Sequence, residues 1–467
     1  MLFLHSKKCI IPPLFCIIPK TILLSRNSCF IIQAMKQSKI FCLIFSIFFS
    51  VFPVFSSEAA SAEIQISKIK VFLDDEELYQ DSEADGKISL STILSYTKFR
   101  ENKKYSQEEF KKEVEKTKLR LTKSGLFYSA EVETRASRKN PGTMVVYISA
   151  RRGFLFRFGG GNAYGLFGKA AVGGKRNMLT GYLGYNKNGL SYIDENTFGL
   201  PLILGGSFCT NVPQWLVEKA ALSFDAVFRT GFFINPDLKL GIDVKALTTI
   251  NGADSSTAAA SQDCFTEFTI SPFYSQNILL SEKFIMNAEL RLYNYFSANF
   301  QTKSFEAAIN ADYNPHKKIT LAGLVCGGSV ISSTNKAAEE SAIAKINLEK
   351  ASVDLYDRSG LANRGIRSGY STEELATDCY ILLSTELRWK ALNFKLPPFF
   401  PVEILPYLFS DLCLAHEYSD KETRVLDAYG VGLQINFDCP VFAYFNFSYG
   451  INHHGKGKFV FAAMQSF

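Results

Sequence analysis

The chain has no closely paired cysteines beyond its hydrophobic amino-terminal region. Ten cysteines occur among 467 residues, and four of them, Cys9, Cys16, Cys29 and Cys42, lie before residue 63. The other six are widely separated, which argues against a zinc-binding motif and against a compact disulfide framework. They are expected to be single apolar residues of strands: Cys209, Cys264, Cys326, Cys379, Cys413 and Cys439.

Dense basic runs are missing as well. A formal net charge of +6 is spread over the whole length, so nucleic acid is not expected as a partner. The sequence contains no Gly-x-Ser-x-Gly nucleophile elbow and no phosphate-binding loop, and "GGGNAYG" at 159–165 misses the dinucleotide-binding spacing by one residue. We therefore expect a protein that is not an enzyme, with no catalytic residue and no cofactor.

Histidine is scarce, with five residues in the chain. His316 and His416 are isolated, whereas His453 and His454 are adjacent. Neighbouring side chains of a strand point to opposite faces, so two adjacent histidines are poorly placed to share a metal ion. A solvated pair is the favoured interpretation, and no metal site is expected.

Long hydrophobic runs are confined to the amino-terminal region. With a mean hydropathy of +0.03 and 21% charged residues, the chain is too polar for a bundle of membrane helices. After Met35, two lysines precede an apolar run at 40–55 and the small residues of 60–62, as in a secretory signal peptide. The alternative is a transmembrane anchor, for which the run is short. Residues 1–62 are predicted to be an extension and a signal peptide, with the true start at Met35 and the mature chain beginning at Glu63.

Residues 63–152 have the pattern of a small α+β domain. Ser106 and Glu109 form a capping box at the start of the longer helical segment, in which Phe110 and Leu121 share one apolar stripe. The order of elements and the segment "LTKSGLFYSAEVE" resemble a POTRA domain. The predicted elements, in the order β-α-α-β-β, are a strand at 64–73, helices at 88–97 and 106–125, and strands at 126–135 and 143–149.

From residue 153 onward the hydrophobic period changes to two. In "YGVGLQINF" at 429–437, apolar residues alternate with glycine, glutamine and asparagine. Such strands of about ten residues are typical of a transmembrane barrel, although a soluble sandwich alternates too. The 315 residues of 153–467 (467 − 152) allow about 20 residues for each of 16 strands. The expected fold is an all-β transmembrane barrel of about 16 antiparallel strands, preceded by one small α+β POTRA domain.

The segment "IRSGY" at 366–370 opens a stretch that resembles the BamA/TamA superfamily of outer-membrane assembly and secretion proteins. The resemblance covers nearly all the mature chain and is strongest from Arg367 to Phe467. Members of the superfamily carry a Val-Arg-Gly-Phe/Tyr motif on the sixth outward loop, which folds back into the lumen. The counterpart here is "IRSGY" at 366–370, with Arg367, Gly369 and Tyr370 retained and Ser368 inserted. An alternative register places the motif arginine at Arg364, without the aromatic residue. We favour Arg367.

Two later segments strengthen this resemblance. "YILLSTELRW" and "LPYLFSDLCL" resemble the strands that follow the loop, and their alternation directs Glu386 and Asp411 into the lumen. An arginine is a rigid fork of donors that can hold two carboxylates at once. We therefore expect a loop latch, in which the loop is pinned to the inner wall; the alternative is an ordinary solvated loop. The predicted latch residues are Arg367, Gly369, Tyr370, Glu386 and Asp411, with Gly365 and Gly369 allowing sharp turns.

Members of the superfamily act at the seam between the first and last strands. The first barrel strand is predicted in "FLFRFGGGNA" at 154–163, and the chain ends on a strand with an aromatic row. Glycine weakens a strand, and a weak seam would open toward lipid and expose an edge for an incoming strand. Relief of crowding inside the barrel is the alternative role for these glycines. The predicted seam residues are Gly159, Gly160, Gly161, Phe459, Phe461 and Phe467.

The resemblance implies a protein of the bacterial outer membrane that assembles or translocates other proteins. The POTRA domain, in the periplasm, would bind extended substrate, and the barrel would insert or export it through the seam or the lumen. The implied partners are unfolded outer-membrane or exported proteins, outer-membrane lipid and periplasmic accessory proteins. A single POTRA domain favours a specialised member. The alternative is a passive outer-membrane pore or structural surface antigen of the same architecture.

Overall fold

The computed structural model describes most of the chain that follows the predicted signal peptide. Residues 1–62, with the predicted start at Met35 and the predicted cleavage site, lie outside the described residues. The described residues are 63–464, apart from 80–87, 125, 154, 162–163, 186, 219–220, 251–263, 282, 297–299, 336–345, 348–365, 372–373, 397–399, 418–421 and 440–441.

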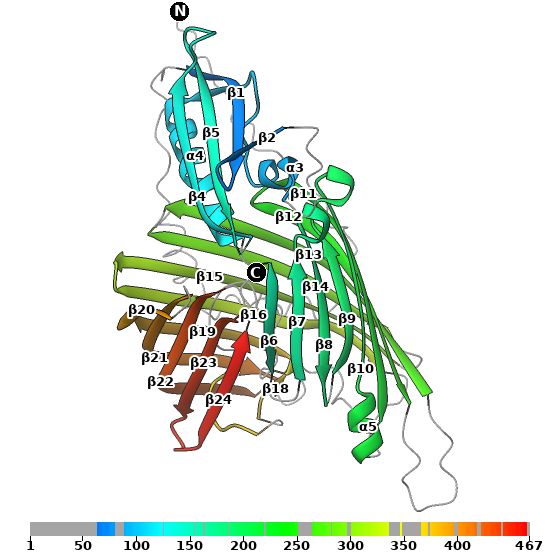
Figure 1. The fold of residues 1–467 in the computed structure, drawn as a ribbon. Coiled ribbons are helices and arrows are strands. Elements are labelled where there is room, and N and C mark those ends of the chain that lie inside the picture. Colours follow the sequence, from blue (N-terminus) through cyan, green and yellow to red (C-terminus); the bar gives the residue numbers. More distant parts are fainter. Residues whose placement is uncertain are drawn as a thin grey trace, which may run out of the picture. The chain divides into compact units, whose positions relative to one another are not determined.

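The first part of the described chain forms a small α+β domain with a mixed sheet (Figure 1). The sheet order is β2-β1-β5-β4, in which β1 and β5 run parallel and the other pairs antiparallel. The predicted order β-α-α-β-β is confirmed, with two short strands added. The elements are β1 (Glu63–Leu73), β2 (Glu76–Leu78), α3 (Leu90–Leu94), β3 (Lys104–Ser106), α4 (Gln107–Lys123), β4 (Phe127–Ala136) and β5 (Thr143–Arg152).

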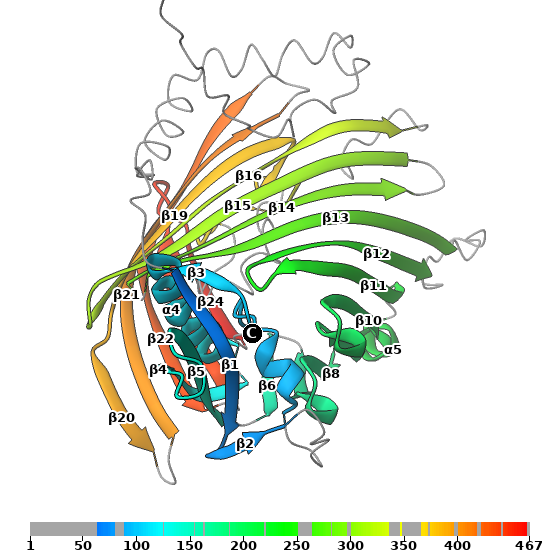
Figure 2. The same cartoon turned by 90° about the horizontal axis from the view of Figure 1, so that it is seen from above.

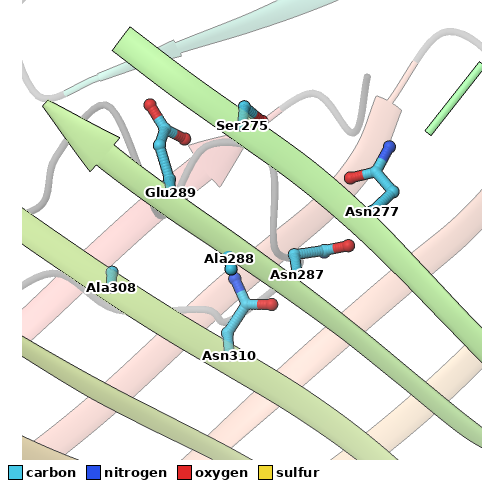
Figure 3. A pocket seen from close by; sticks show the side chains of 7 residues that line it. All are labelled: Ser275, Asn277, Asn287, Ala288, Glu289, Ala308 and Asn310. Atoms are coloured by element: carbon cyan, nitrogen blue, oxygen red, sulfur yellow. The ribbon is translucent and has the colours of Figure 1, made fainter. Parts of the chain in front are cut away.

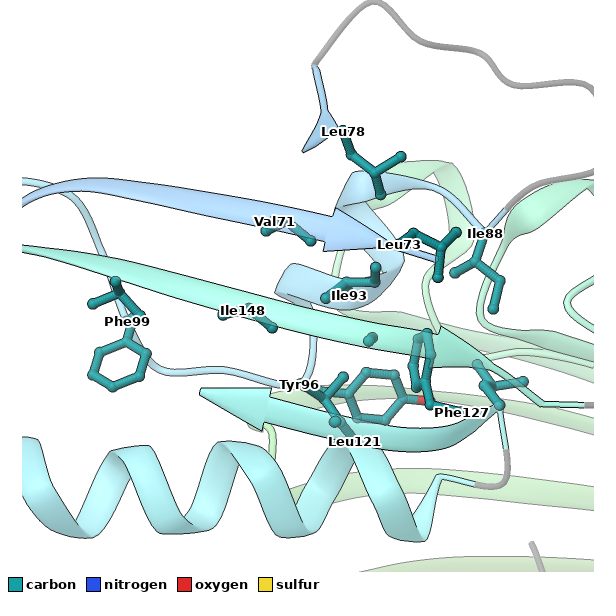
Figure 4. Close-up of a cluster of buried hydrophobic side chains, with 14 of the residues drawn as sticks. Val71, Leu73, Leu78, Ile88, Ile93, Tyr96, Phe99, Leu121, Phe127 and Ile148 are labelled. Atoms are coloured by element: carbon teal, nitrogen blue, oxygen red, sulfur yellow. The ribbon is translucent and has the colours of Figure 1, made fainter. Parts of the chain in front are cut away.

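Helix α4 begins where the sequence predicts. The Ser106 side chain accepts a hydrogen bond from the Glu109 amide, and the Glu109 side chain accepts one from the Ser106 amide, so two otherwise unpaired donors are satisfied. Phe110 and Leu121 are buried against the sheet. Figure 4 shows Leu121 among core side chains from both layers, including Ile148 of β5. Gly125, the last residue of the predicted helix, lies outside the described residues.

The rest of the described chain closes into an antiparallel barrel (Figures 1 and 2). Its 17 labelled segments correspond to 16 strands, because β19 and β20 pair in succession with the same strand, β21. The predicted fold class is therefore confirmed. The barrel strands are β6 (Phe156–Gly161), β7 (Tyr164–Ala170), β8 (Asn177–Gly184), β9 (Asn188–Asp194), β10 (Leu202–Thr210), β11 (Leu222–Asn235), β12 (Leu238–Ile250), β13 (Cys264–Ser281), β14 (Phe284–Phe296), β15 (Phe300–His316), β16 (Ile319–Asn335), β19 (Cys379–Trp389), β20 (Leu392–Leu396), β21 (Phe400–His416), β22 (Thr423–Cys439), β23 (Phe442–Ile451) and β24 (Gly457–Met464).

The two faces of the barrel wall differ in polarity, as β19 illustrates. Leu383, Leu387 and Trp389 are 42%, 45% and 55% exposed on the outer face. Glu386 and Arg388 are buried on the inner face. An apolar exterior on a closed barrel matches a surface that faces lipid, where every backbone group must be paired within the protein. Among the described residues, no helix has the length and apolarity that a membrane span requires.

The N-terminal domain contacts the barrel through a buried arginine of α4. Arg120 donates from Nε and Nη2 to the two carboxylate oxygens of Asp237, over 2.6 and 2.8 Å, and from Nη1 to Glu113 over 2.7 Å. Asp237 lies in the turn between β11 and β12. Burial raises the pKa of Asp237, but the hydrogen bonds and charge interactions with Arg120 and Lys98 together outweigh burial and lower that pKa. Arg120 thus holds one carboxylate of its own helix and one of the barrel.

Replacing Arg120 with alanine is expected to loosen the N-terminal domain on the barrel. The substitution leaves two buried carboxylates without their shared partner, which costs about 3–5 kcal/mol. Limited proteolysis should then cut the connection after residue 152 faster than in the wild type. The matched control is Arg135→Ala, since the ion pair of Arg135 with Glu133 is exposed and contributes at most about 1 kcal/mol. Equal cleavage rates in the two variants would contradict a docking role for Arg120.

Candidate functional site

The loop tip, residues 366–371, lies ahead of β19, and residues 366–368 and Tyr370 within it are buried. Arg367 is 1% exposed and Ser368 is fully buried. Two strands of the barrel wall provide the surroundings, because Ser384 of β19 is directly opposite Asp411 of β21. Since inward residues recur at every second position of a strand, Ser384 and Glu386 lie on the same side of β19 as the loop tip.

Two carboxylates hold the Arg367 guanidinium. Its Nε and Nη2 donate to the two oxygens of Asp411 over 2.8 and 2.6 Å, and its Nη1 donates to Glu386 Oε1 over 2.5 Å. The Arg367 backbone amide also donates to Asp411, over 3.2 Å. The structure therefore brings together the three charged residues that the sequence assigned to the loop latch. A fork with this many fixed partners leaves the arginine one orientation.

Two further polar residues complete the charge cluster. Ser384 Oγ donates to Asp411 Oδ1 over 2.6 Å and accepts from Arg367 Nη2 over 3.0 Å. Arg388 donates from Nε to Glu386 Oε2 over 2.8 Å. Two positive and two negative side chains thus balance one another in a buried site. This balance is required, because an unpaired charge at such a site is strongly destabilising.

An aromatic ring packs against the other side of the arginine. The Arg367 guanidinium carbon lies 3.7 Å from the centre of the Phe409 ring, within the range of a cation–π contact. Phe409 is directly opposite Gly430, which in turn is opposite Gly450. A Cβ atom on either glycine would collide with the Phe409 ring, and one on Gly450 would also collide with the Arg367 carbonyl oxygen. The two glycines therefore make the space that the ring and the loop tip occupy.

Gly450→Ala is expected to displace the loop tip and weaken the folded barrel. The added methyl group would overlap the Arg367 carbonyl oxygen and the Phe409 ring, and overpacking of this kind costs about 1–3 kcal/mol. The midpoint of heat unfolding, followed by the gel mobility of the folded barrel, measures the effect. Gly323→Ala in β16 is the matched control, since nothing lies within 4 Å of the position of its Cβ. A similar midpoint for both variants would show that the loop tip does not depend on this close approach.

Gly369 contacts the turn that precedes β24, and Tyr370 contacts β22. The Gly369 amide donates to the Lys456 carbonyl oxygen over 3.2 Å, and the Tyr370 hydroxyl donates to Asp427 Oδ1 over 2.9 Å. Gly369 is the central residue of a tight turn, in which the Tyr370 amide donates to the Ser368 carbonyl oxygen over 3.0 Å, but its φ lies outside the left-handed region that favours glycine. A Cβ there would instead lie 2.9 Å from the Gly457 carbonyl oxygen. Gly369 is thus suited to close approach, whereas Gly365 and Arg364 lie outside the described residues.

The predicted seam residues lie on two neighbouring strands. Gly159, Gly160 and Gly161 belong to β6, and Phe459 and Phe461 belong to β24. Within the described part of the two strands, their antiparallel pairing comprises one residue pair, Ala463 with Gly160. The next pair of strands, β23 and β24, has eight such residue pairs. Phe467 lies outside the described residues.

Some contacts of the site could not be read from the sequence. The cation–π partner Phe409 was missed, although the Gly-x-Gly of 430–432 opposite an aromatic strand was an available signal. His453, expected to be solvated, donates from Nδ1 to Asp427 over 2.6 Å. Within the described ranges, no group of three or more His, Cys, Asp or Glu side chains is placed to hold a metal ion.

A polar pocket, lined mostly by uncharged side chains, lies on the wall formed by β13, β14 and β15 (Figure 3). Asn277, Asn287 and Asn310 are directly opposite one another on these strands, and Ser275 and Glu289 lie beside them. Leu290 and Ile309, which alternate with these residues, are exposed on the other face. The wall at this place therefore offers amide donors and acceptors, in contrast to the charged site around Arg367.

No family model matches the sequence, and no curated protein matches it either. Among solved structures, the chain is similar to BamA from Haemophilus ducreyi lacking POTRA domains 1–3, with 15% identity and a TM-score of 0.41 over 86% of this chain and 85% of that one. It is also similar to CdiB from Escherichia coli, with 11% identity and a TM-score of 0.46 over 86% and 75% of the two chains. CdiB from Acinetobacter baumannii is similar as well, with 11% identity and a TM-score of 0.45 over 85% of this chain and 73% of that one. Identities and scores this low carry no functional argument.

Proposed function

We propose that this chain is an outer-membrane factor of the BamA/TamA type, which inserts or exports other proteins. The observation that carries the proposal is the buried arginine of the loop tip, held by Glu386 and Asp411 inside a closed barrel. A buried ion pair is weak evidence for stability, because well-packed apolar residues of the same volume often stabilise a fold as well or better. Its presence at the tip of a loop therefore favours a positional role, which is to keep the loop inside the barrel.

The N-terminal domain supplies a site for capturing an extended substrate. Among the described strands, β4 pairs only with β5 and forms one edge of the sheet. The backbone groups of such an edge can pair with a strand from another chain. Glu131, Glu133 and Arg135 are exposed along β4, and charges of this kind keep an edge from pairing indiscriminately. We expect unfolded outer-membrane or exported proteins to bind here, with the domain in the periplasm.

The seam between β6 and β24 provides the exit toward lipid. Three consecutive glycines in β6 contribute no side-chain packing, and glycine loses the most entropy when a strand orders. Among the described residues, β6 and β24 share one antiparallel residue pair against eight for β23 and β24, so we expect the seam to open at lower cost than its neighbour. A substrate strand would pair with the exposed edges of β6 and β24, and the apolar face of the substrate would enter the lipid. Periplasmic accessory proteins would act upstream, at the N-terminal domain.

Depletion of the protein in its native host tests this function. We expect a fall in the amounts of particular outer-membrane or exported proteins, measured by quantitative proteomics of the membrane fraction, and recovery when the wild-type chain is restored. A passive pore or structural surface antigen would instead leave those amounts unchanged. An altered uptake of small solutes with unchanged protein amounts would overturn the proposal.

A further inference from the structure

The loop tip is held at a second place, by Asp427 of β22. The Tyr370 hydroxyl donates to Asp427 Oδ1 over 2.9 Å and accepts from the Asp427 amide over 3.2 Å. Ser368 Oγ donates to the Asp427 carbonyl oxygen over 2.9 Å. These contacts are separate from the charge cluster around Arg367, and they use both the carboxylate and the backbone of one residue.

The same carboxylate oxygen binds the turn between the last two strands. His453 donates to Asp427 Oδ1 from its ring Nδ1 over 2.6 Å and from its backbone amide over 3.3 Å. An ionised carboxylate has no proton to give, so Nδ1 must be the donor. Asp427 therefore lies between two segments that are far apart in sequence, the loop tip and the terminal hairpin turn, residues 452–456.

The terminal hairpin turn is well ordered by its own hydrogen bonds. Asn452 is fully buried, and its side-chain oxygen accepts from the His454 and Lys456 amides over 3.1 and 2.9 Å. Gly455 has a φ of 75°, which glycine adopts without strain. We expect a turn braced in this way to move together with the strand that follows it, which is β24, one side of the seam.

We propose that Asp427 is a positioning residue that couples the loop tip to the terminal hairpin turn. Displacement of β24 at the seam would pull His453 from the carboxylate and free Tyr370, and release of the loop tip would loosen the turn in the same way. The Gly369 amide, bonded to the Lys456 carbonyl oxygen, adds a direct contact between the two segments. The coupling deepens the proposed function and rests on it, since it links the latch to the opening of the seam.

Reciprocal thiol labelling of the purified, folded barrel tests the coupling. A reporter cysteine is placed either in the loop, as Ser371→Cys, or in the turn, as His454→Cys, both at exposed positions. Maleimide labelling at each reporter is followed by mass spectrometry, so native cysteines do not interfere. Tyr370→Phe should raise labelling in the turn, and His453→Phe should raise labelling in the loop. Coupling free energies between sites typically correspond to changes of about 5-fold or more.

Asp427→Ala should raise labelling at both reporters, and adding Tyr370→Phe to it should change little more. Asp225→Asn is the matched control, because Asp225 is a carboxylate of β11 that pairs with Lys245 and does not contact the loop tip in the described structure. Should Tyr370→Phe and His453→Phe each affect only their own segment, the coupling is overturned. The labelling needs no assembly activity, so a negative depletion experiment with positive labelling would reject the proposed function and keep the coupling.

Discussion

Arg367→Ala is expected to destabilise the folded barrel and to remove its assembly activity. The substitution leaves Glu386 and Asp411 buried with a shortage of positive charge, and breaking a buried pair in this way costs about 3–5 kcal/mol. Phe409 also loses its cation–π partner. The midpoint of heat unfolding should fall, and the loop should become accessible to protease. In depleted cells, the variant should fail to restore the affected outer-membrane proteins.

Two companion variants separate charge from geometry at this position. Arg367→Lys keeps the positive charge but loses the planar fork that reaches both carboxylates, so it should recover only part of the stability. Arg364→Ala removes the other arginine of the alternative register and should change little, because Arg367 already occupies both Glu386 and Asp411. A larger effect of Arg364→Ala than of Arg367→Ala would show that the favoured register is wrong.

Locking the seam is expected to abolish assembly while the fold stays intact. Gly160 and Ala463 are directly opposite each other, and opposed residues of antiparallel strands are about 4.5–5.5 Å apart, within reach of a disulfide. Cells that carry Gly160→Cys with Ala463→Cys should lose complementation under oxidising conditions and regain it with a reductant. The readout is the amount of client proteins in the outer membrane.

The control places the same cross-link elsewhere in the barrel. Ala226 of β11 and Ala246 of β12 are opposed in the same manner, and Ala226→Cys with Ala246→Cys closes a strand pair that has no part in the seam. This variant should complement under both conditions. If the locked seam complements as well as the control does, lateral opening plays no part in the function, and a passive pore would behave in that way.

Much of the fold could be predicted because it depends on local patterns. A period of two assigns residues to one face or the other of a strand, and the capping box of Ser106 and Glu109 fixes the start of α4. For the same reason, alternation predicted that Glu386 points inward. The role of these residues as a latch stays a prediction, although the structure brings the arginine and both carboxylates together.

The remaining contacts could not be predicted because they depend on register and on the path of a loop. Alternation does not say which residues of two strands lie opposite each other, and so it did not place Phe409 over Gly430. It also could not bring His453 to Asp427, since that contact depends on how far β22 extends beyond the end of β23.

The sequence by itself determined a small α+β domain, a barrel with a polar interior, and an arginine-bearing loop before two strands with inward carboxylates. The tertiary structure alone decided that one residue, Asp427, bonds both the loop tip and the terminal hairpin turn, and that Arg120 joins the N-terminal domain to the barrel. The physical reason is the range of the interactions. Periodicity and capping act within a few residues, whereas these hydrogen bonds join segments that meet only when the barrel closes.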